Sequence, residues 1–427
     1  MMSKKSPQLR FEGFTDNWEE RKLGDTETHF TDGNYGESYP SAKDMSDKAN
    51  GIPFLRGSDF SNGYLDSSNA NYIKPEKHAE LTSGHIKQDD IVLAVRGSLG
   101  TLGYATKENE GWNINSQLAI LRTNKSEISG MFLIQYLLGS KGQKEIFSRN
   151  TGTALKQLPI KQLKDIPVPV PTLLEQQKIG NFFKELDGTI ALHQRKLDLL
   201  KEQKKGYLQK MFPKNGAKVP ELRFAGFADD WEERKFESLL DKNEGVRRGP
   251  FGSALKKDLF VKESPYVVYE QQNAIYDHYE TRYNISKEKF EELHKFELIA
   301  DDFIMSGAGT IGRISKVPKG IKKGVFNQAL IRFRINKELT DSEYFLQFIR
   351  ADFMQRKFTG ANPGSAITNL VPMSDVKKWE IKVPIKEEQK KIGSFFKQLD
   401  ETIALHQRKL DLLKEQKKGF LQTMFAK

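Results

Sequence analysis

One glycine-rich segment has the residue types and spacing that could bind a nucleotide phosphate. Residues 307–312 read GAGTIG and fit the pattern G-x-G-x-x-G. A dinucleotide-binding fold also needs a helix directly afterwards and an acidic residue about 20 positions further on. The residues that follow here are strand-like and basic, ending near Arg332 and Arg334, and the related GSLGTLG at 97–103 lacks the spacing. Tight turns between strands therefore explain these glycines better than a cofactor site does.

The other common catalytic patterns are missing from the sequence. There is no G-K-[ST] phosphate loop, no H-E-x-x-H metal motif and no G-x-S-x-G nucleophile elbow. Asn362-Pro363-Gly364 comes nearest to the Asn-Pro-Pro-aromatic run with which amino-methyltransferases hold an extruded base, but it lacks the second proline and the aromatic residue. The seven histidines are scattered, and none pairs at metal-ligand spacing. We therefore expect a binding module, with no catalytic residue and no metal site, in preference to an enzyme.

Composition and charge indicate the compartment and the kind of partner that such a module would have. The 427 residues carry a net charge of +11 and no cysteine. No apolar run approaches the roughly 18–20 residues of a membrane helix, and the N-terminus has no apolar signal region. We expect a cytoplasmic, bacterial-type protein. Residues 18–172 have a net charge of −1 and residues 231–384 one of +4, so a polyanionic partner would have to be bound by patterned faces and not by a basic tail.

Two segments that must position any binding residues occur twice at the same offset of 213. PQLRFEGFTDNWEERK at 7–22 returns as PELRFAGFADDWEERK at 220–235, with 12 of 16 residues identical. IGNFFKELDGTIALHQRKLDLLKEQKKGYLQKMF at 179–212 returns at 392–425 with 29 of 34 identical. The residues between these segments differ. The chain is therefore two half-proteins in tandem, in which nearly identical connectors carry divergent variable parts.

Both copies of the longer repeat have the apolar periodicity of a coiled-coil helix. Seam residues alternate in steps of four and three for over four heptads, and a histidine and a lysine take seam places in each copy. The seam includes Ile179, Phe183, Leu186, Ile190, His193, Leu197 and Leu200, and Ile392, Phe396, Leu399, Ile403, His406, Leu410 and Leu413, and it continues through Lys204 and Lys417. We interpret the histidines as polar residues that set the register, although metal ligands or pH switches are alternatives. The two helices are predicted to pack antiparallel.

The variable parts share a faint common plan. Apolar strands are expected in IPFLRGSDF at 52–60 and SPYVVYEQQNAI at 264–275, then in 89–105 and 301–315, and then in 113–122 and 325–334. A helix-like segment follows at 131–149 and at 342–358. Short strands, glycine-marked turns and a helix predict two α+β globules. The predicted boundaries are 1–172 and 214–384 for the globular domains, and 173–213 and 385–427 for the helices.

The order of variable domain and repeated helix resembles the specificity subunit of type I restriction–modification enzymes over essentially the whole chain. The resemblance also includes TGTALKQLPIKQLKDIPVPVPTLLEQQKI at 151–179, RGSLGTLG at 96–103, RRGPFGSAL at 247–255 and LDLLKEQKKGYLQKMF at 197–212. The exit strand of the second half departs from the first, since WEIKVPIKEEQKKI replaces DIPVPVPTLLEQQKI.

This resemblance implies a non-catalytic subunit with two target recognition domains. Each domain would read one half of a split double-stranded DNA sequence, and the antiparallel helices would set the unread gap between the halves. Two methyltransferase subunits would bind, one to each half, and restriction–translocase subunits would join for cleavage. S-adenosylmethionine, ATP and Mg²⁺ would belong to these partners and not to this chain.

Candidate DNA contacts follow the first apolar strand of each domain or lie in the glycine-rich loops. Arginine can pair with guanine edges, and glutamine or asparagine with adenine. The candidates are Arg56, Ser58, Asp59, Arg96, Arg247, Arg248, Lys256, Lys257, Gln271, Gln272 and Asn273. For each of them, a solvated surface side chain or a structural turn is the alternative.

The near-identity of the two helices extends to exposed Lys, Glu and Gln, which a hydrophobic core does not require. We therefore expect their exposed faces, with the segments around Trp18 and Trp231, to form two equivalent docking sites for the partner subunits. The N-terminal segment is expected to pack beside the end of the second helix. A bivalent protein-binding scaffold with a coiled-coil spacer, and a self-contained nuclease or methyltransferase, are the alternative functions.

Overall fold

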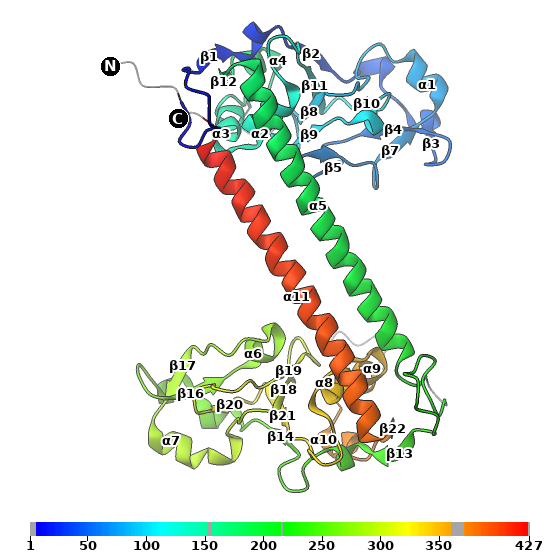
Figure 1. The fold of residues 1–427 in the computed structure, drawn as a ribbon, viewed down its shortest axis with the longest axis vertical. Coiled ribbons are helices and arrows are strands. Elements are labelled where there is room, and N and C mark those ends of the chain that lie inside the picture. The colour runs from blue at the N-terminus through cyan, green and yellow to red at the C-terminus, as the bar shows by residue number, and fades with distance from the viewer. Residues whose placement is uncertain (1–5, 153–155, 215–216, 360–370, 426–427) are drawn as a thin grey trace. The chain divides into compact units, whose positions relative to one another are not determined.

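The structure is a computed structural model that describes residues 6–152, 156–214, 217–359 and 371–425 (Figure 1). The chain divides into two compact units, residues 1–195 with 407–427 and residues 196–406. Each unit thus combines one globular domain with part of each long helix. Part of the motif at 151–179 (residues 153–155) and the Asn362-Pro363-Gly364 segment lie outside the described residues.

The globular domain of the first unit is built on three sheets. Six strands lie in the order β2-β11-β8-β9-β6-β5, four in the order β10-β4-β7-β3, and β1 pairs antiparallel with β12. The strands are β1 (Glu19–Lys22), β2 (His29–Asp32), β3 (Met45–Ser46), β4 (Ile52–Leu55), β5 (Phe60–Ser61), β6 (Tyr64–Leu65), β7 (Asn71–Ile73), β8 (Ile91–Ala94), β9 (Leu102–Tyr104), β10 (Asn113–Ile114), β11 (Leu118–Arg122) and β12 (Pro167–Val170). The helices are α1 (Pro75–Glu80), α2 (Gly130–Leu138), α3 (Ser140–Ser148), α4 (Ile160–Lys164) and the long α5 (Leu173–Lys210).

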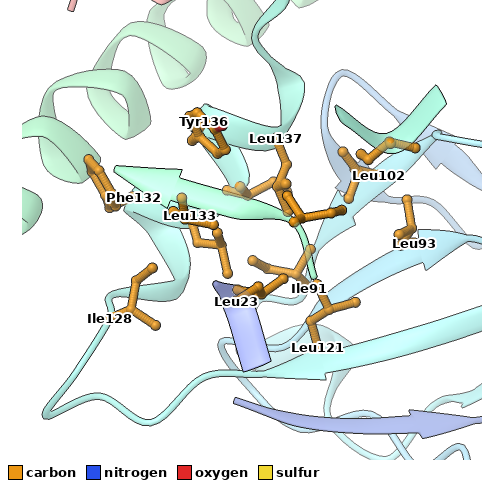
Figure 2. Close-up of a cluster of buried hydrophobic side chains, with 14 of the residues drawn as sticks. Leu23, Ile91, Leu93, Leu102, Leu121, Ile128, Phe132, Leu133, Tyr136 and Leu137 are labelled. Carbon is orange, nitrogen blue, oxygen red and sulfur yellow. The ribbon is translucent and has the colours of Figure 1, made fainter. Parts of the chain in front are cut away.

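The core of this domain lies between the large sheet and α2. Figure 2 shows Ile91 and Leu93 of β8 and Leu121 of β11 facing Phe132, Leu133 and Leu137 of α2, all of them buried. Every residue of β8 is buried, because one face of the strand packs on α2 and the other on the smaller sheet. A central strand buried on both faces explains why IVLA is a continuous apolar run in the sequence.

The second unit repeats this plan with different side chains. Its sheets have the orders β14-β21-β18-β19, β15-β17-β16-β20 and β13-β22. The strands are β13 (Glu232–Lys235), β14 (Val246–Arg248), β15 (Phe260–Val261), β16 (Tyr266–Tyr269), β17 (Tyr283–Ile285), β18 (Phe303–Ser306), β19 (Ile314–Lys316), β20 (Gly324–Phe326), β21 (Leu330–Phe333) and β22 (Glu380–Val383). The helices are α6 (Gln271–Tyr276), α7 (Lys287–Glu292), α8 (Ser342–Arg350), α9 (Asp352–Thr359), α10 (Met373–Val376) and the long α11 (Lys386–Thr423).

The long helices run antiparallel within each unit, as predicted. In the first unit Asp187 of α5 forms an ion pair with Lys417 of α11 (2.6 Å), and the Phe182 ring packs edge-on against Phe420. In the second unit Lys204 of α5 pairs with Asp400 of α11 (2.6 Å), and the Tyr207 ring packs edge-on against Phe395. Residue numbers rise along one helix as they fall along the other, so the direction is antiparallel in both units.

Three segments differ from the predicted secondary structure. The segments 131–149 and 342–358 each form two helices instead of one, because Gly139 and Ala351 take extended backbone conformations and end α2 and α8. The segment at 264–275 is a strand only as far as Tyr269. Its continuation forms α6, because Asn273 and Glu270 form a reciprocal capping box that starts a helix.

The N-terminal segment packs beside the end of α11, which confirms the predicted closure. The Leu9 amide donates to the Thr423 carbonyl (3.0 Å), and the Leu222 amide donates in the same way to the Lys210 carbonyl (2.9 Å). Phe425 packs in the core of the first domain, and Phe212 occupies the corresponding place in the second. Each domain is thus completed by the C-terminal end of one long helix.

Candidate nucleic-acid interface

Three loops and the start of α6 meet in one place in the second domain. The guanidinium of Arg248, at the end of β14, donates to the Gln328 carbonyl (3.5 Å). The Gly307 amide after β18 donates to the Ala329 carbonyl (2.7 Å), and the side-chain amide of Gln271 donates to the Ala308 carbonyl (2.5 Å). We call Arg248, Phe251, Gln271, Ala308 and Gln328 the second loop cluster.

The first domain brings together the corresponding loops. The Tyr35 hydroxyl donates to the Ser116 carbonyl (3.1 Å), and the Arg96 guanidinium lies 5.3 Å from the centre of the Tyr35 ring. The Arg96 amide donates to the Gln117 carbonyl (3.2 Å). We call Tyr35, Ser58, Arg96, Ser98 and Ser116 the first loop cluster; Ser58 belongs to it because its neighbour Gly57 approaches Ser98.

The backbone of the two clusters is equivalent even though the side chains differ. The Asn115 amide donates to the Leu55 carbonyl (2.9 Å), and the Asn327 amide donates to the Tyr269 carbonyl (3.0 Å). A Cβ on Gly33 would lie 2.3 Å from the Asn115 carbonyl oxygen, and one on Gly249 would lie 1.9 Å from that of Asn327. Because only glycine permits this approach, the loop after β2 and the loop after β14 are held against equivalent neighbouring segments.

Two of the candidate contacts in the first domain are held by hydrogen bonds within the fold. Asp59 is 3% exposed, and its carboxylate accepts hydrogen bonds from the Arg56 amide (2.8 Å), the Arg56 guanidinium and the Ser58 hydroxyl. Its oxygens therefore face inward, and the prediction that Asp59 contacts a base is wrong. Arg56 is half-buried and also donates to the Asn69 carbonyl (2.5 Å), whereas Ser58 is exposed.

Asn273 is the counterpart of Asp59 and is likewise a structural residue. It is 0% exposed, accepts from the Glu270 amide (2.7 Å) and donates to the carbonyls of His278 and Glu280 (2.9 Å each). The prediction that Asn273 reads adenine is therefore wrong, since its amide is fully used inside the domain. Gln271 and Gln272 are half-buried on α6, and Gln271 lies in the second loop cluster.

The basic residues among the candidate DNA contacts differ in how exposed their side chains are. Arg248, Lys256 and Lys257 are exposed, and Arg96 is exposed in the first domain. Arg247 is half-buried and donates to Glu244 (3.0 Å). Glu244 also binds Arg332, a guanidinium that is 1% exposed, at 2.6 Å. The hydrogen bond from Arg332 is the largest cause that lowers the pKa of Glu244.

The two tryptophans that were predicted to mark docking surfaces lie in the domain cores. Trp18 is 2% exposed and its indole donates to Glu175 (3.2 Å), while Trp231 is 4% exposed. Their rings pack edge-on against Phe425 and Phe212. The indoles cannot themselves touch a partner, because they anchor the repeated segments onto the helix ends. Docking by the surrounding exposed residues stays a prediction.

The predicted seam residues lie along the inner side of the helix pair. None of the fourteen is fully exposed. Nine are buried: Ile179, Phe183, Ile190, Leu197, Leu200, Ile392, Phe396, Leu410 and Leu413. Five are half-buried: Leu186, His193, Leu399, Ile403 and His406.

The ion pairs across the helices are unusually enclosed. The Asp187 and Lys417 side chains are 8% and 15% exposed. Burial is the main reason why the pKa of Asp187 is raised, against the opposing effect of Lys417. Burial likewise lowers the pKa of Lys204 against the effect of Asp400. The second pair lies where the helices meet their globular domain, since the Gln347 amide donates to Asp400 (3.0 Å). The first pair lies at the equivalent place, since Asp187 is hydrogen-bonded by the Gln135 side chain.

The chemistry available at the loop clusters is hydrogen bonding, positive charge and aromatic stacking. Among the described residues there is no group of three or more His, Cys, Asp or Glu side chains that could hold a metal ion. No helix in the described part of the chain is long and apolar enough to cross a membrane.

Tyr35 and Phe251 belong to the loop clusters but were not among the candidate contacts predicted from the sequence. The available signal was an aromatic residue two positions after the close-packed Gly33 and Gly249, inside two otherwise divergent loops.

Comparisons with known proteins agree on one family. The family model described as "Type I restriction modification DNA specificity domain" matches the chain twice, at residues 15–202 and 228–415. The chain is 24% identical over 424 residues to the type I restriction enzyme MjaX specificity subunit of Methanocaldococcus jannaschii, covering 96% of this chain and 93% of the relative. It is 20% identical over 384 residues to the MjaVIII specificity subunit of the same organism, covering 85% and 86%.

Solved structures share the fold. The crystal structure of a type I restriction–modification S subunit from M. genitalium superimposes with a TM-score of 0.63 at 13% identity, covering 99% of both chains. A chain from a study of complex assembly and conformational transition in the type I system gives a TM-score of 0.53 at 15% identity, covering 96% of this chain and 97% of that chain. At these identities the likeness concerns the fold alone.

Proposed function

Because the chain belongs to the family of type I restriction–modification DNA specificity subunits, we propose that its two globular domains each read one half of an asymmetric, bipartite DNA target. One observation carries this proposal: equivalent backbones hold the two loop clusters, but their side chains differ. The same position is Arg96 in one cluster and Ala308 in the other. Two readers with one geometry and different hydrogen-bonding groups would recognise different base sequences.

The long helices would set the separation of the two half-sites. Each has 38 residues, which corresponds to about 57 Å at 1.5 Å per residue. Half-site spacing follows from the geometry of the protein that bridges it. A stretch of unread bases between the two halves is therefore part of the proposal.

The chain would act without catalytic residues or cofactors of its own. Two methyltransferase subunits would dock on the exposed faces of 179–212 and 392–425, and restriction–translocase subunits would join them for cleavage. S-adenosylmethionine, ATP and Mg²⁺ would be bound by these partners. The repetition of exposed side chains in the two helices supports two equivalent docking sites. We propose that the complex acts on DNA in the cytoplasm.

Methylation mapping of host DNA tests the proposal. Single-molecule sequencing would compare a strain that carries the gene with one from which it is deleted, with the partner genes expressed in both. The expected result is a split, asymmetric motif that loses N6-methyladenine on deletion. If no motif changes, the chain is not a DNA-reading subunit, and a bivalent protein-binding scaffold becomes the better explanation. The motif found would also provide the DNA for the experiments below.

A further inference from the structure

Phe251 lies at the tip of a basic loop and has almost no protein contacts. Its side chain is 88% exposed, more than any other large apolar side chain that is described. Exposing a phenylalanine ring to water costs free energy that burial would recover. A single exposed apolar side chain marks no site by itself, so what counts is how the loop holds the ring and which charges lie beside it.

The loop holds Phe251 outward through defined contacts. The Gly249 amide donates to the Leu330 carbonyl (3.0 Å), and the close approach of Gly249 to Asn327 leaves no space for a side chain. Pro250 is buried, and the Ala254 amide donates to the Phe251 carbonyl (2.9 Å). The residues on both sides of Phe251 are therefore anchored, and the ring is presented by a structured turn.

Basic residues flank Phe251 in the same stretch of the chain. Arg248, Lys256 and Lys257 are exposed, and Asp258 is an exposed acid in the same stretch. Three cations against one carboxylate leave the loop basic. A polyanion with aromatic groups in its interior matches a basic loop with an apolar tip, and duplex DNA has this chemistry. In many DNA-binding proteins, an apolar side chain enters between base pairs while basic residues hold the phosphates.

The first domain has an aromatic residue at the same loop position, in a different state. Tyr35 follows Gly33 by two residues, as Phe251 follows Gly249. Tyr35 is 43% exposed, its hydroxyl is bound to the Ser116 carbonyl, and Arg96 lies over its ring. Burial raises the pKa of the Tyr35 hydroxyl. Tyr35 is held against its domain, whereas Phe251 is free to enter another molecule.

We propose that Phe251 is a wedge that inserts between two base pairs of the half-site read by the second domain. This inference rests on the proposed function and names a specificity-determining residue for it. Insertion would partly unstack one base step and favour sequences that deform easily there. The first half-site would be bound without insertion, because Tyr35 is committed to its own domain.

The test measures DNA binding and base stacking with the full chain. The duplex carries the motif found by methylation mapping, with 2-aminopurine placed in turn at each position of the second half-site. Wild-type protein is expected to raise the fluorescence at one step. Phe251→Ala is expected to abolish this rise and to weaken binding by about 5- to 150-fold, the range measured for losing one aromatic–base stack. Phe251→Leu is expected to retain most of both signals, since leucine also serves as a wedge.

Arg248→Ala is the matched control within the same loop. It is expected to weaken binding through a phosphate contact and to reduce the slope of log K against log salt by about one, whereas Phe251→Ala leaves that slope unchanged. Phe251→Ala should also unfold at the wild-type midpoint, because Phe251 is 88% exposed and little packing is lost with its ring.

The outcomes separate the two proposals. If wild-type protein prefers the motif but Phe251→Ala gives the same affinity and fluorescence, the wedge is wrong and DNA reading stands. If Phe251→Ala keeps its DNA binding but no longer co-purifies with the methyltransferase subunits, the loop contacts protein and the wedge is again wrong. If wild-type protein does not distinguish the motif from random duplex, the proposed function itself fails.

Discussion

Single residues at equivalent positions of the two domains keep their structural role while their chemical type changes. Asp59 and Asn273 each accept a hydrogen bond from the backbone amide three residues earlier, at 2.8 and 2.7 Å. Both closed turns direct the neighbouring Ser58 and Gln271 into the loop clusters. A polar residue just after a strand can therefore either contact DNA or stabilise the turn, and only its burial shows which of the two roles it has.

Replacing Asn273 tests its supporting role. Asn273→Ala leaves one buried amide and two carbonyls without their partner, which is expected to lower the free energy of unfolding by about 1–3 kcal/mol. Chemical denaturation of the full chain, followed by circular dichroism, measures this loss. The neighbouring Gln272→Ala serves as the control and should change stability little. A loss of DNA affinity in Asn273→Ala at unchanged stability would instead make Asn273 a reader.

The Glu244–Arg332 pair predicts a dependence on pH. The hydrogen bond from Arg332 holds the pKa of Glu244 below its ordinary value of 4.5. A lowered pKa in the folded state means that the stabilisation is complete above pH 4.5 and is lost as the pH falls through the folded-state pKa. Glu244→Gln should therefore cost about 1–2 kcal/mol at neutral pH, a figure moderated by the partial exposure of Glu244.

The measurement for this pair is the difference in unfolding free energy between wild type and Glu244→Gln from pH 7 down to pH 3. The difference should shrink below about pH 4.5. Glu237→Gln, at an exposed position nearby, provides the control. A difference that stays constant over this range would show that the carboxylate charge contributes nothing to the pair.

At the scale of elements, the two long helices are joined by contacts that occur twice. Asp187–Lys417 and Lys204–Asp400 are equivalent pairs at the offset of 213, and both measure 2.6 Å. The stacked rings Phe183–Phe425 and Phe396–Phe212 are equivalent in the same way, with interplanar angles of 20° and 18°. Enclosed charges of this kind favour one register of a helix pair, because any shift leaves a carboxylate or ammonium group unpaired.

Exchange of the charges tests this register function. Asp187→Lys alone and Lys417→Asp alone should each lower the free energy of unfolding by about 1–3 kcal/mol, since each places two like charges together in an enclosed site. The double variant should recover at least half of the summed loss in a double-mutant cycle. The exposed pair Lys22–Asp165, with side chains 62% and 43% exposed, is the control and should show a coupling of about 0–1 kcal/mol. Additive losses at the enclosed pair would rule out the register function.

At the scale of the whole molecule, the chain is closed on itself by contacts and not by a covalent link. Arg10 binds Glu175 and Arg223 binds Glu388, with 2.7 Å in both cases. One repeated segment follows a long helix in the sequence, while the other reaches its helix end only in space. The same packing would therefore form if the two ends of the chain were at the equivalent position between the two halves.

A circular permutant tests this closure. Joining residue 427 to residue 1 through a flexible linker and opening the chain within 213–219 should yield a folded protein that directs methylation to the same motif. Thermal unfolding and methylation mapping in cells provide the two measurements. As a control, opening within β8, where every residue is buried, should prevent folding. Aggregation of the 213–219 permutant would contradict the closure.

Much of this architecture was available from the sequence because it depends on local periodicity and on repetition. The heptads of 179–212 and 392–425 predicted two helices and their seam, and the offset of 213 predicted two equivalent halves. The resemblance to the specificity subunits rested on the same segments and on the loop motifs. The breaks at Gly139 and Ala351 were not predicted, because an apolar helical pattern continues across both residues.

Which polar residues face outward depends on contacts between segments that are distant in the sequence. Asp59 and Asn273 are as hydrophilic as a residue that contacts a base, yet both are buried inside turns. Trp18 lies in a core that is completed by Phe425, and Trp231 lies in one that is completed by Phe212. Phe251 is a residue of the type that usually lies in a core, but it is exposed to solvent. Periodicity reports which face of a helix or strand is apolar, but the burial of a loop residue depends on segments that are distant in the chain, and these meet only when the domain is folded.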